Sequence, residues 1–143
     1  MPLPATHSRL PIALLLLRWS TALVLFMWTI DKFLHPDHAA KVYEKYYFIG
    51  GLGSGVMLVV GTLEMALLIA FVAGACKRVS YGLVCVIHAV STFSAFKMYL
   101  TPFEPMHLLF FAAWPMLAAC VALYLLRDAD TLFSFDSRAR SAG

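Results

Sequence analysis

The sequence contains a long apolar run from Leu52 to Gly74 with one ionisable side chain, Glu64, close to its middle. An α-helix rises 1.5 Å per residue, so about 20 apolar residues match the hydrocarbon thickness of a bilayer. We therefore interpret the run as a membrane-spanning helix. A carboxyl group at mid-depth in a bilayer is costly in either protonation state, so Glu64 is expected to face a helix bundle and to have a polar partner there.

Three further apolar segments predict three more membrane spans. The 143 residues are 62% hydrophobic and only 13% charged, a balance far from that of soluble domains. The predicted fold is all-α: one domain over residues 1–143 that forms an integral membrane four-helix bundle with up-down-up-down antiparallel topology, because the connections are short. The spans are expected at roughly residues 11–34, 52–74, 79–100 and 106–126. A polar tail follows at 127–143 and is expected to be frayed beyond its cluster of Leu132, Phe133 and Phe135.

The first span has some features of a secretory signal peptide, namely Arg9, a leucine run and the small residues Ser20 and Ala22. However, Arg18 interrupts the leucine run, and apolar sequence continues well past the small residues. We therefore expect an uncleaved span.

The segment after the first span is rich in Lys and Tyr. Pro36 is suited to the first turn of a helix, and tyrosines follow at roughly helical spacing. This pattern predicts a short amphipathic helix that lies in the membrane interface with its rings at headgroup level.

The formal charge of +3 comes from basic residues scattered at the ends of segments, without the Lys/Arg cluster that nucleic-acid binding requires. No nucleic-acid partner is expected; the lipid bilayer is the expected partner. Four spans place both termini on one side, and basic residues favour the cytoplasmic side. Six flank one side and four the other: Arg9, Lys77, Arg78, Arg127, Arg138 and Arg140 against Lys32, Lys41, Lys45 and Lys97. We expect a bacterial inner-membrane protein with both termini in the cytoplasm.

Three ionisable residues are expected at similar depth within this bundle. Counted at 1.5 Å per residue from the cytoplasmic ends of their spans, Arg18, Glu64 and His88 fall about 10 to 16 Å inside. They form the candidate ligand-binding site, with Arg18 and Glu64 predicted to be coupled. No catalytic residue is identified.

Helical phase supports an inward polar stripe on each helix, at about 100° per residue. The first stripe comprises Arg18, Thr21, Ala22, Leu25, Thr29 and Lys32. On the second helix Gly53, Met57, Gly61, Glu64 and Leu68 share a face, and on the third Tyr81, His88, Ser91, Thr92, Ala95 and Tyr99 do so.

Two interpretations of this polar layer stay open. In one, it is a structural cluster that fixes the helix register, a role that buried polar groups play in membrane bundles. In the other, it is a site for a proton, a quinone headgroup or another small polar ligand.

No cofactor or metal motif is evident. The cysteines Cys76, Cys85 and Cys120 form no C-x-x-C pair. Haem would need two facing axial histidines, whereas His88 is alone at mid-depth and His107 lies near the opposite surface. Asp31, His35 and His38 have metal-like spacing, but Pro36 interrupts the helix and a fourth ligand is missing, so no metal site is predicted.

The pattern LLLRWSTALVLFMWTIDKFLHP, an aromatic-rich loop, a glycine-rich entry and GTLEMALLIAFVAG together resemble the DoxX family of small four-helix membrane proteins. The resemblance spans nearly the whole chain. The pieces most similar to the family are Arg18, the Asp31-Lys32-Phe33 turn before a proline, and Glu64 followed by small residues.

The resemblance implies a limited function. The family is named for a subunit of an archaeal quinone-linked sulfur-oxidising system, and other members are linked to membrane redox complexes. It implies a non-catalytic subunit or anchor of a membrane assembly, with redox-complex subunits or further copies of the chain as partners. The alternative is a quinone- or thiosulfate-linked oxidoreductase component that binds its ligand at Arg18, Glu64 and His88.

Overall fold

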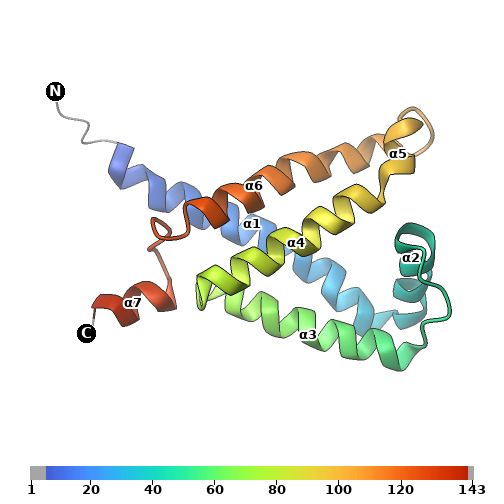
Figure 1. The fold of residues 1–143 in the computed structure, drawn as a ribbon, viewed down its shortest axis with the longest axis horizontal. Coiled ribbons are helices and arrows are strands. Elements are labelled where there is room, and N and C mark those ends of the chain that lie inside the picture. The colour runs from blue at the N-terminus through green and yellow to red at the C-terminus, as the bar shows by residue number, and fades with distance from the viewer. Residues whose placement is uncertain (1–5, 142–143) are drawn as a thin grey trace.

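The computed structural model describes residues 6–141, and within this range the chain is helical, without strands. Four long helical segments follow one another, and short helices lie at their ends (Figure 1). The long segments are α1 (Thr6–Leu34), α3 (Ser54–Val72), α4 (Lys77–Ser94) and α6 (Ala113–Leu125), which the 3₁₀-helix η1 (His107–Ala112) precedes. The short helices are α2 (Pro36–Tyr47), α5 (Phe96–Leu100) and α7 (Phe135–Ser141).

The long helices pack in a ring in which α1 contacts α3, α3 contacts α4, α4 contacts α6 and α6 contacts α1. The turn between α3 and α4 lies at the same end of the molecule as α7, whereas α2 and α5 lie at the opposite end (Figure 1). Away from their connecting turn, α3 and α4 diverge, and α2 lies beside the space that opens between them.

Within residues 6–141, three helices are long and apolar enough to cross a membrane: Arg9–Leu34, Ser54–Val72 and His107–Leu125. Their length and apolarity indicate an integral membrane protein. The predicted third span, 79–100, is not among them. Its helix breaks at Ala95 and resumes as α5, and its first turn is basic, so α4 has lower hydropathy than the other three segments.

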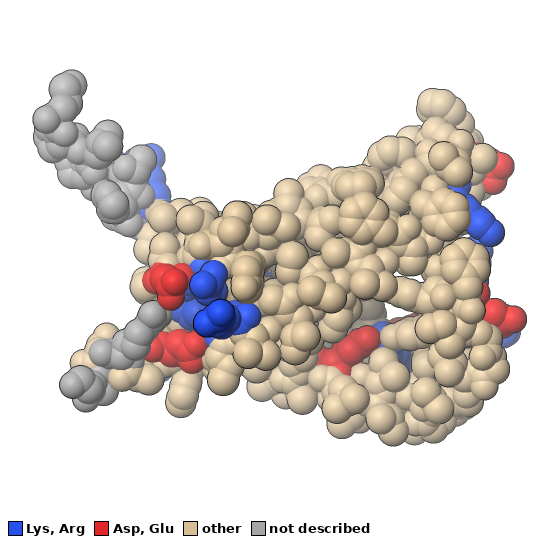
Figure 2. All heavy atoms as spheres, in the orientation of Figure 1, with Lys and Arg blue, Asp and Glu red and all other residues tan. Residues whose placement is uncertain are grey.

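Burial is inverted relative to a soluble protein. Arg18, His88 and Asp130 are completely buried, whereas Leu23 and Leu63 are more than half exposed. Charged side chains gather at the two ends of the molecule, and between them the visible face carries other residues, except for acidic atoms beside a hollow (Figure 2). An apolar exterior around a polar interior is the arrangement that a hydrocarbon solvent favours.

The inward stripe predicted for the first helix is confirmed, since all six of its residues are buried. On the third predicted stripe, Tyr81, His88 and Thr92 of α4 and Ala95 just after it are buried. Ser91 of α4 and Tyr99 of α5 are half-buried. On the α3 stripe the prediction fails at Gly53, which is exposed and precedes the helix.

The short helix predicted from Pro36 onward is present as α2, and its position in the membrane interface stays a prediction. Pro36 occupies its first turn, where a missing N–H costs no intrahelical bond. Phe48 ends it in the left-handed conformation and donates its backbone N–H to Tyr43 O.

Gly61 lets α1 and α3 approach closely. A Cβ at this position would lie 3.1 Å from Lys32 Cβ and 3.1 Å from the Phe33 ring. This close contact places Lys32 against α3 at Gly61, which lies about one helical turn before Glu64.

Replacing Gly61 by Ala is expected to destabilise the protein by about 1–3 kcal/mol, because the added methyl group overpacks the contact with α1. Thermal unfolding in detergent measures the effect. Gly55→Ala is the matched control on the same helix, because a Cβ there meets nothing within 4 Å. Equal melting temperatures for the two variants would show that α1 and α3 do not depend on this approach.

Candidate functional site

The first polar cluster, called here the end cluster, consists of Arg18, Tyr81 and Asp130. Arg18 Nη1 lies 3.1 Å from Asp130 Oδ2, and both side chains are completely buried. Tyr81 donates its hydroxyl to the same carboxylate oxygen at 2.6 Å and accepts a hydrogen bond from Arg18 at 3.0 Å. The buried charge of Arg18 is thus compensated by a carboxylate from the segment after α6.

The second terminal nitrogen of the Arg18 guanidinium group binds the backbone of that segment. Arg18 Nη2 donates to Leu132 O at 2.7 Å and to Phe133 O at 3.3 Å. Gly74, at the end of α3, makes room for this group: its φ is +60°, and a Cβ would lie only 2.5 Å from Arg18 Nη1. Glycine is therefore required both by the backbone conformation and by the space.

The segment after α6 is fixed to the α3–α4 turn by further bonds. Asp136 accepts hydrogen bonds from the backbone N–H groups of Cys76 and Lys77 at 2.9 Å each, at the start of α4. The Lys77 ammonium donates to Asp130 O and to Ser137 Oγ. The predicted fraying beyond Phe135 is therefore wrong for residues 136–141, which belong to α7 and whose Asp136 carboxylate caps the N-terminus of α4.

The second polar cluster consists of Glu64, Lys32, Thr29 and Tyr43 and lies toward α2. It is called here the cavity cluster, after the cavity described below. Lys32 Nζ lies 2.8 Å from Glu64 Oε2, with the side chains 8% and 20% exposed. Thr29 donates to the same oxygen at 3.4 Å, and Tyr43 on α2 donates to Oε1 at 3.4 Å. Three helices therefore meet at this carboxylate.

The Tyr43 phenol has a raised pKa, chiefly because it is half-buried and also because it lies beside the negative charge of Glu64. The hydroxyl therefore stays protonated over the physiological pH range and keeps donating to Glu64.

The predicted pairing of Arg18 with Glu64 is wrong. About three turns of α1 separate Arg18 from Thr29, which binds Glu64, and this corresponds to about 16 Å. Each residue has a nearer partner of opposite charge, Asp130 and Lys32 respectively. The three candidate residues accordingly do not form one layer: Arg18 belongs to the end cluster, apart from Glu64 and His88.

His88 is completely buried on α4. Its Nε2 lies 3.1 Å from Ala113 O on α6, and its ring stacks on Trp28 of α1 at 6.1 Å between centroids. Because a carbonyl oxygen only accepts, Nε2 carries the hydrogen, and Nδ1 is a lone-pair acceptor. Nδ1 is buried without a hydrogen-bond partner.

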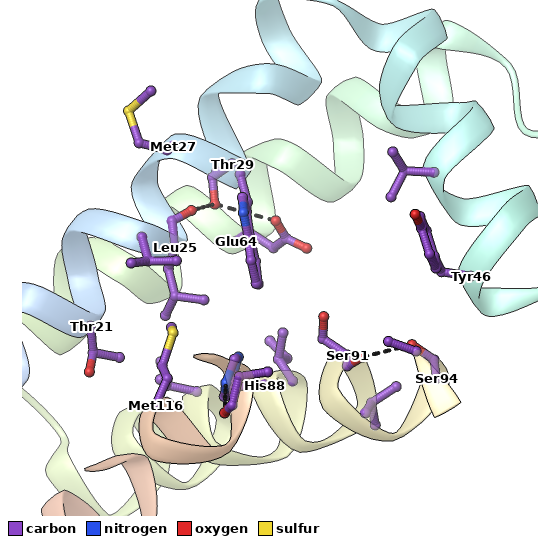
Figure 3. Close-up of a pocket in the computed structure, with 18 of the residues that line it drawn as sticks. Thr21, Leu25, Met27, Thr29, Tyr46, Glu64, His88, Ser91, Ser94 and Met116 are labelled. Atoms are coloured by element: carbon purple, nitrogen blue, oxygen red, sulfur yellow. Dashed lines mark hydrogen bonds between the residues drawn. The ribbon is translucent and has the colours of Figure 1, made fainter. Parts of the chain in front are cut away.

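A cavity of about 1090 Å³ lies among the long helices, and residues of α2 form part of its lining. Glu64 points into it from α3, and His88, Ser91 and Ser94 lie on the opposite wall, which α4 forms (Figure 3). Lys32, Tyr43 and mostly apolar side chains complete the lining. Small-molecule sites are typically of this size, with an apolar wall and a few polar groups.

Among the described residues, no group of three or more His, Cys, Asp or Glu side chains is arranged to hold a metal ion. Asp31 instead accepts contacts from His35 at 3.1 Å and His38 at 2.7 Å, and these rings are largely exposed. Cys76, Cys85 and Cys120 are free thiols.

Comparisons with models of protein families, with curated proteins and with solved structures find no match for this chain. The resemblance to the DoxX family therefore stays a prediction.

Sequence reasoning placed Glu64 and His88 on the inward faces of their helices but missed two ionic partners. Lys32 was placed on the inward stripe of the first helix, one turn after Thr29. A basic side chain that faces the interior there could have been identified as the partner of the Glu64 carboxylate. Asp130 follows the last span in a polar stretch, where periodicity carries no signal. The available clue was the unpaired charge of Arg18, which required a carboxylate somewhere.

The two clusters predict different coupling in double-mutant cycles. Arg18→Leu or Asp130→Leu alone is expected to cost about 3–5 kcal/mol, because each leaves an uncompensated buried charge, while the double variant loses clearly less than the sum. Arg18→Leu combined with Glu64→Leu is the matched control and should be additive. Unfolding in detergent gives these energies; additivity for Arg18 with Asp130 would contradict the end cluster.

Proposed function

We propose that the chain is an integral membrane four-helix bundle of the DoxX type, with up-down-up-down topology and both termini in the cytoplasm of a bacterial inner membrane. The ring of contacts among α1, α3, α4 and α6 supports this proposal. The lower hydropathy of α4 fits it as well, because the polar residues of α4 face the interior rather than lipid. The basic residues near α7 and the α3–α4 turn favour the orientation.

Labelling in intact bacterial cells tests the orientation. Cys76, which is exposed at the α3–α4 turn, and a Ser141→Cys variant are expected to resist a membrane-impermeant maleimide, whereas Lys41→Cys on the exposed side of α2 should react. The substituted variants carry Cys76→Ser to remove the background. Reaction of Ser141→Cys before the membrane is disrupted would reverse the proposed orientation.

The proposed activity is the binding of a lipid-soluble small molecule, with quinones as the first class, by a component of a membrane redox assembly. The observation that carries it is the cavity of about 1090 Å³, with the Lys32–Glu64 pair and His88 in an otherwise mostly apolar wall. A quinone combines a polar ring with an apolar tail, and such a cavity offers both environments.

Quinone binding is measurable through Trp28, which lines the cavity. In a protein with Trp19→Phe and Trp114→Phe, decyl-ubiquinone should quench Trp28 fluorescence saturably. Ala119→Phe, which fills part of the cavity, is expected to weaken binding about tenfold or more, because overpacking costs about 1–3 kcal/mol. Ala118→Phe, on the exposed side of the same helix, is the control. Linear, unsaturable quenching would contradict the proposal.

The second candidate is a non-catalytic subunit or anchor without a small ligand. It is favoured by the fact that Lys32, Thr29 and Tyr43 already satisfy the Glu64 carboxylate, as a structural cluster requires. Absence of saturable quinone binding, together with loss of fold in Glu64→Leu, would favour this candidate.

A further inference from the structure

The cavity reaches the end of the molecule at which α2 lies. Its lining includes Asp31 and His38, whose side chains are 29% and 66% exposed. Charged side chains gather at this end, and Figure 2 shows a hollow toward it with acidic atoms at its edge. A carboxylate and an exposed imidazole are groups that water solvates well. The rim of the cavity at the α2 end is therefore polar and accessible to water.

The Lys32–Glu64 pair lies close to this rim. Lys32 and Thr29, which bind the carboxylate, precede the last residue of α1 by about 3 and 8 Å along the helix axis. The Glu64 side chain is 20% exposed and points into the cavity (Figure 3). Water that enters at the α2 end therefore has only a short way to the ion pair.

The cavity ends in an apolar layer on the side away from α2. Leu25, Leu68 and Val84 line the cavity and also belong to the buried hydrophobic core. Beyond this core lies the end cluster, in which the side chains of Arg18 and Asp130 are completely buried. Within residues 6–141, a polar solute that approached from the α7 end would have to cross this closed packing, which is costly.

The lining also contains exposed apolar side chains, among them Met27, Val90 and Leu109. In the proposed bundle these side chains face hydrocarbon, which admits apolar molecules and excludes ions. For a hydrophilic solute, the described part of the chain therefore leaves the α2 end as the way in.

We propose that the cavity has an aqueous entrance at the α2 end, beside Asp31 and His38, through which water and small hydrophilic solutes reach the Lys32–Glu64 pair from one side of the membrane only. The inference goes beyond the proposed binding of a lipid-soluble molecule and does not require it. In functional terms, the Glu64 carboxyl group exchanges protons with the compartment on the α2 side and not with the compartment on the α7 side.

Cysteine accessibility of the full chain in membrane vesicles tests the entrance. Ser91→Cys changes one atom and places a thiol on the cavity wall opposite Glu64 (Figure 3). The reagent is 2-(trimethylammonium)ethyl methanethiosulfonate, a membrane-impermeant cation that the carboxylate of Asp31 at the rim should attract. It is expected to modify the Ser91→Cys thiol.

Leu63→Cys is the matched control, because Leu63 precedes Glu64 on α3 but is 68% exposed and outside the cavity. It should react at least about tenfold more slowly than Ser91→Cys, because hydrocarbon excludes the reagent and disfavours the reactive thiolate. Both variants carry Cys76→Ser, and the protein with Cys76→Ser alone gives the background from Cys85 and Cys120.

Two reporters define the sides of the membrane: Lys41→Cys on the exposed face of α2 and the native Cys76 at the α3–α4 turn. Ser91→Cys is expected to react in vesicles that expose Lys41→Cys and to stay unmodified in vesicles that expose Cys76. Melting temperatures confirm folding, and Ser94→Cys, on the same cavity wall, replaces Ser91→Cys if that variant does not fold. Modification from the Cys76 side, or from neither side in a folded variant, would overturn the inference.

Discussion

The fold depends on the pairing of buried charges. In a low-dielectric interior a single unpaired charge is strongly destabilising, whereas a well-bonded pair is tolerated. Arg18 and Asp130 satisfy this constraint at one end of the molecule, and Lys32 and Glu64 satisfy it toward the other. The two pairs dictate which helices meet: the first ties α1 to the segment after α6, and the second ties α1 to α3, where Tyr43 adds α2.

The two pairs differ in surroundings and therefore in what they can do. The end cluster is closed, because Arg18 is surrounded by the Asp130 carboxylate, the Tyr81 hydroxyl and backbone carbonyl groups, with Gly74 leaving just enough space. The cavity cluster is open on one side, since the Glu64 side chain is partly exposed and lines a large space. This contrast supports a structural role for the end cluster and agrees with the binding role proposed for the cavity cluster.

Much of the fold was predictable from the sequence, because a span of apolar residues and a period of 3.6 are strong local signals. The inward stripe of the first helix and the short helix from Pro36 were both predicted correctly. The pairing of Arg18 was not, because helix phase and depth are properties of single helices, whereas Asp130 lies in an irregular segment whose position depends on tertiary contacts. The cavity was likewise unpredictable, since residues of α1, α2, α3, α4 and α6 line it and its volume depends on how these helices pack together.

The proposed binding function depends on the Glu64 carboxyl group, which pairs with Lys32 and lines the cavity. Infrared difference spectroscopy on addition of decyl-ubiquinone tests this dependence most directly, with the Glu64 band assigned by its absence in Glu64→Gln. If the ligand occupies the cavity, the Glu64 band shifts when decyl-ubiquinone binds and stays unshifted in Ala119→Phe. A Glu64 band that saturating decyl-ubiquinone leaves unchanged would contradict ligand binding beside Glu64.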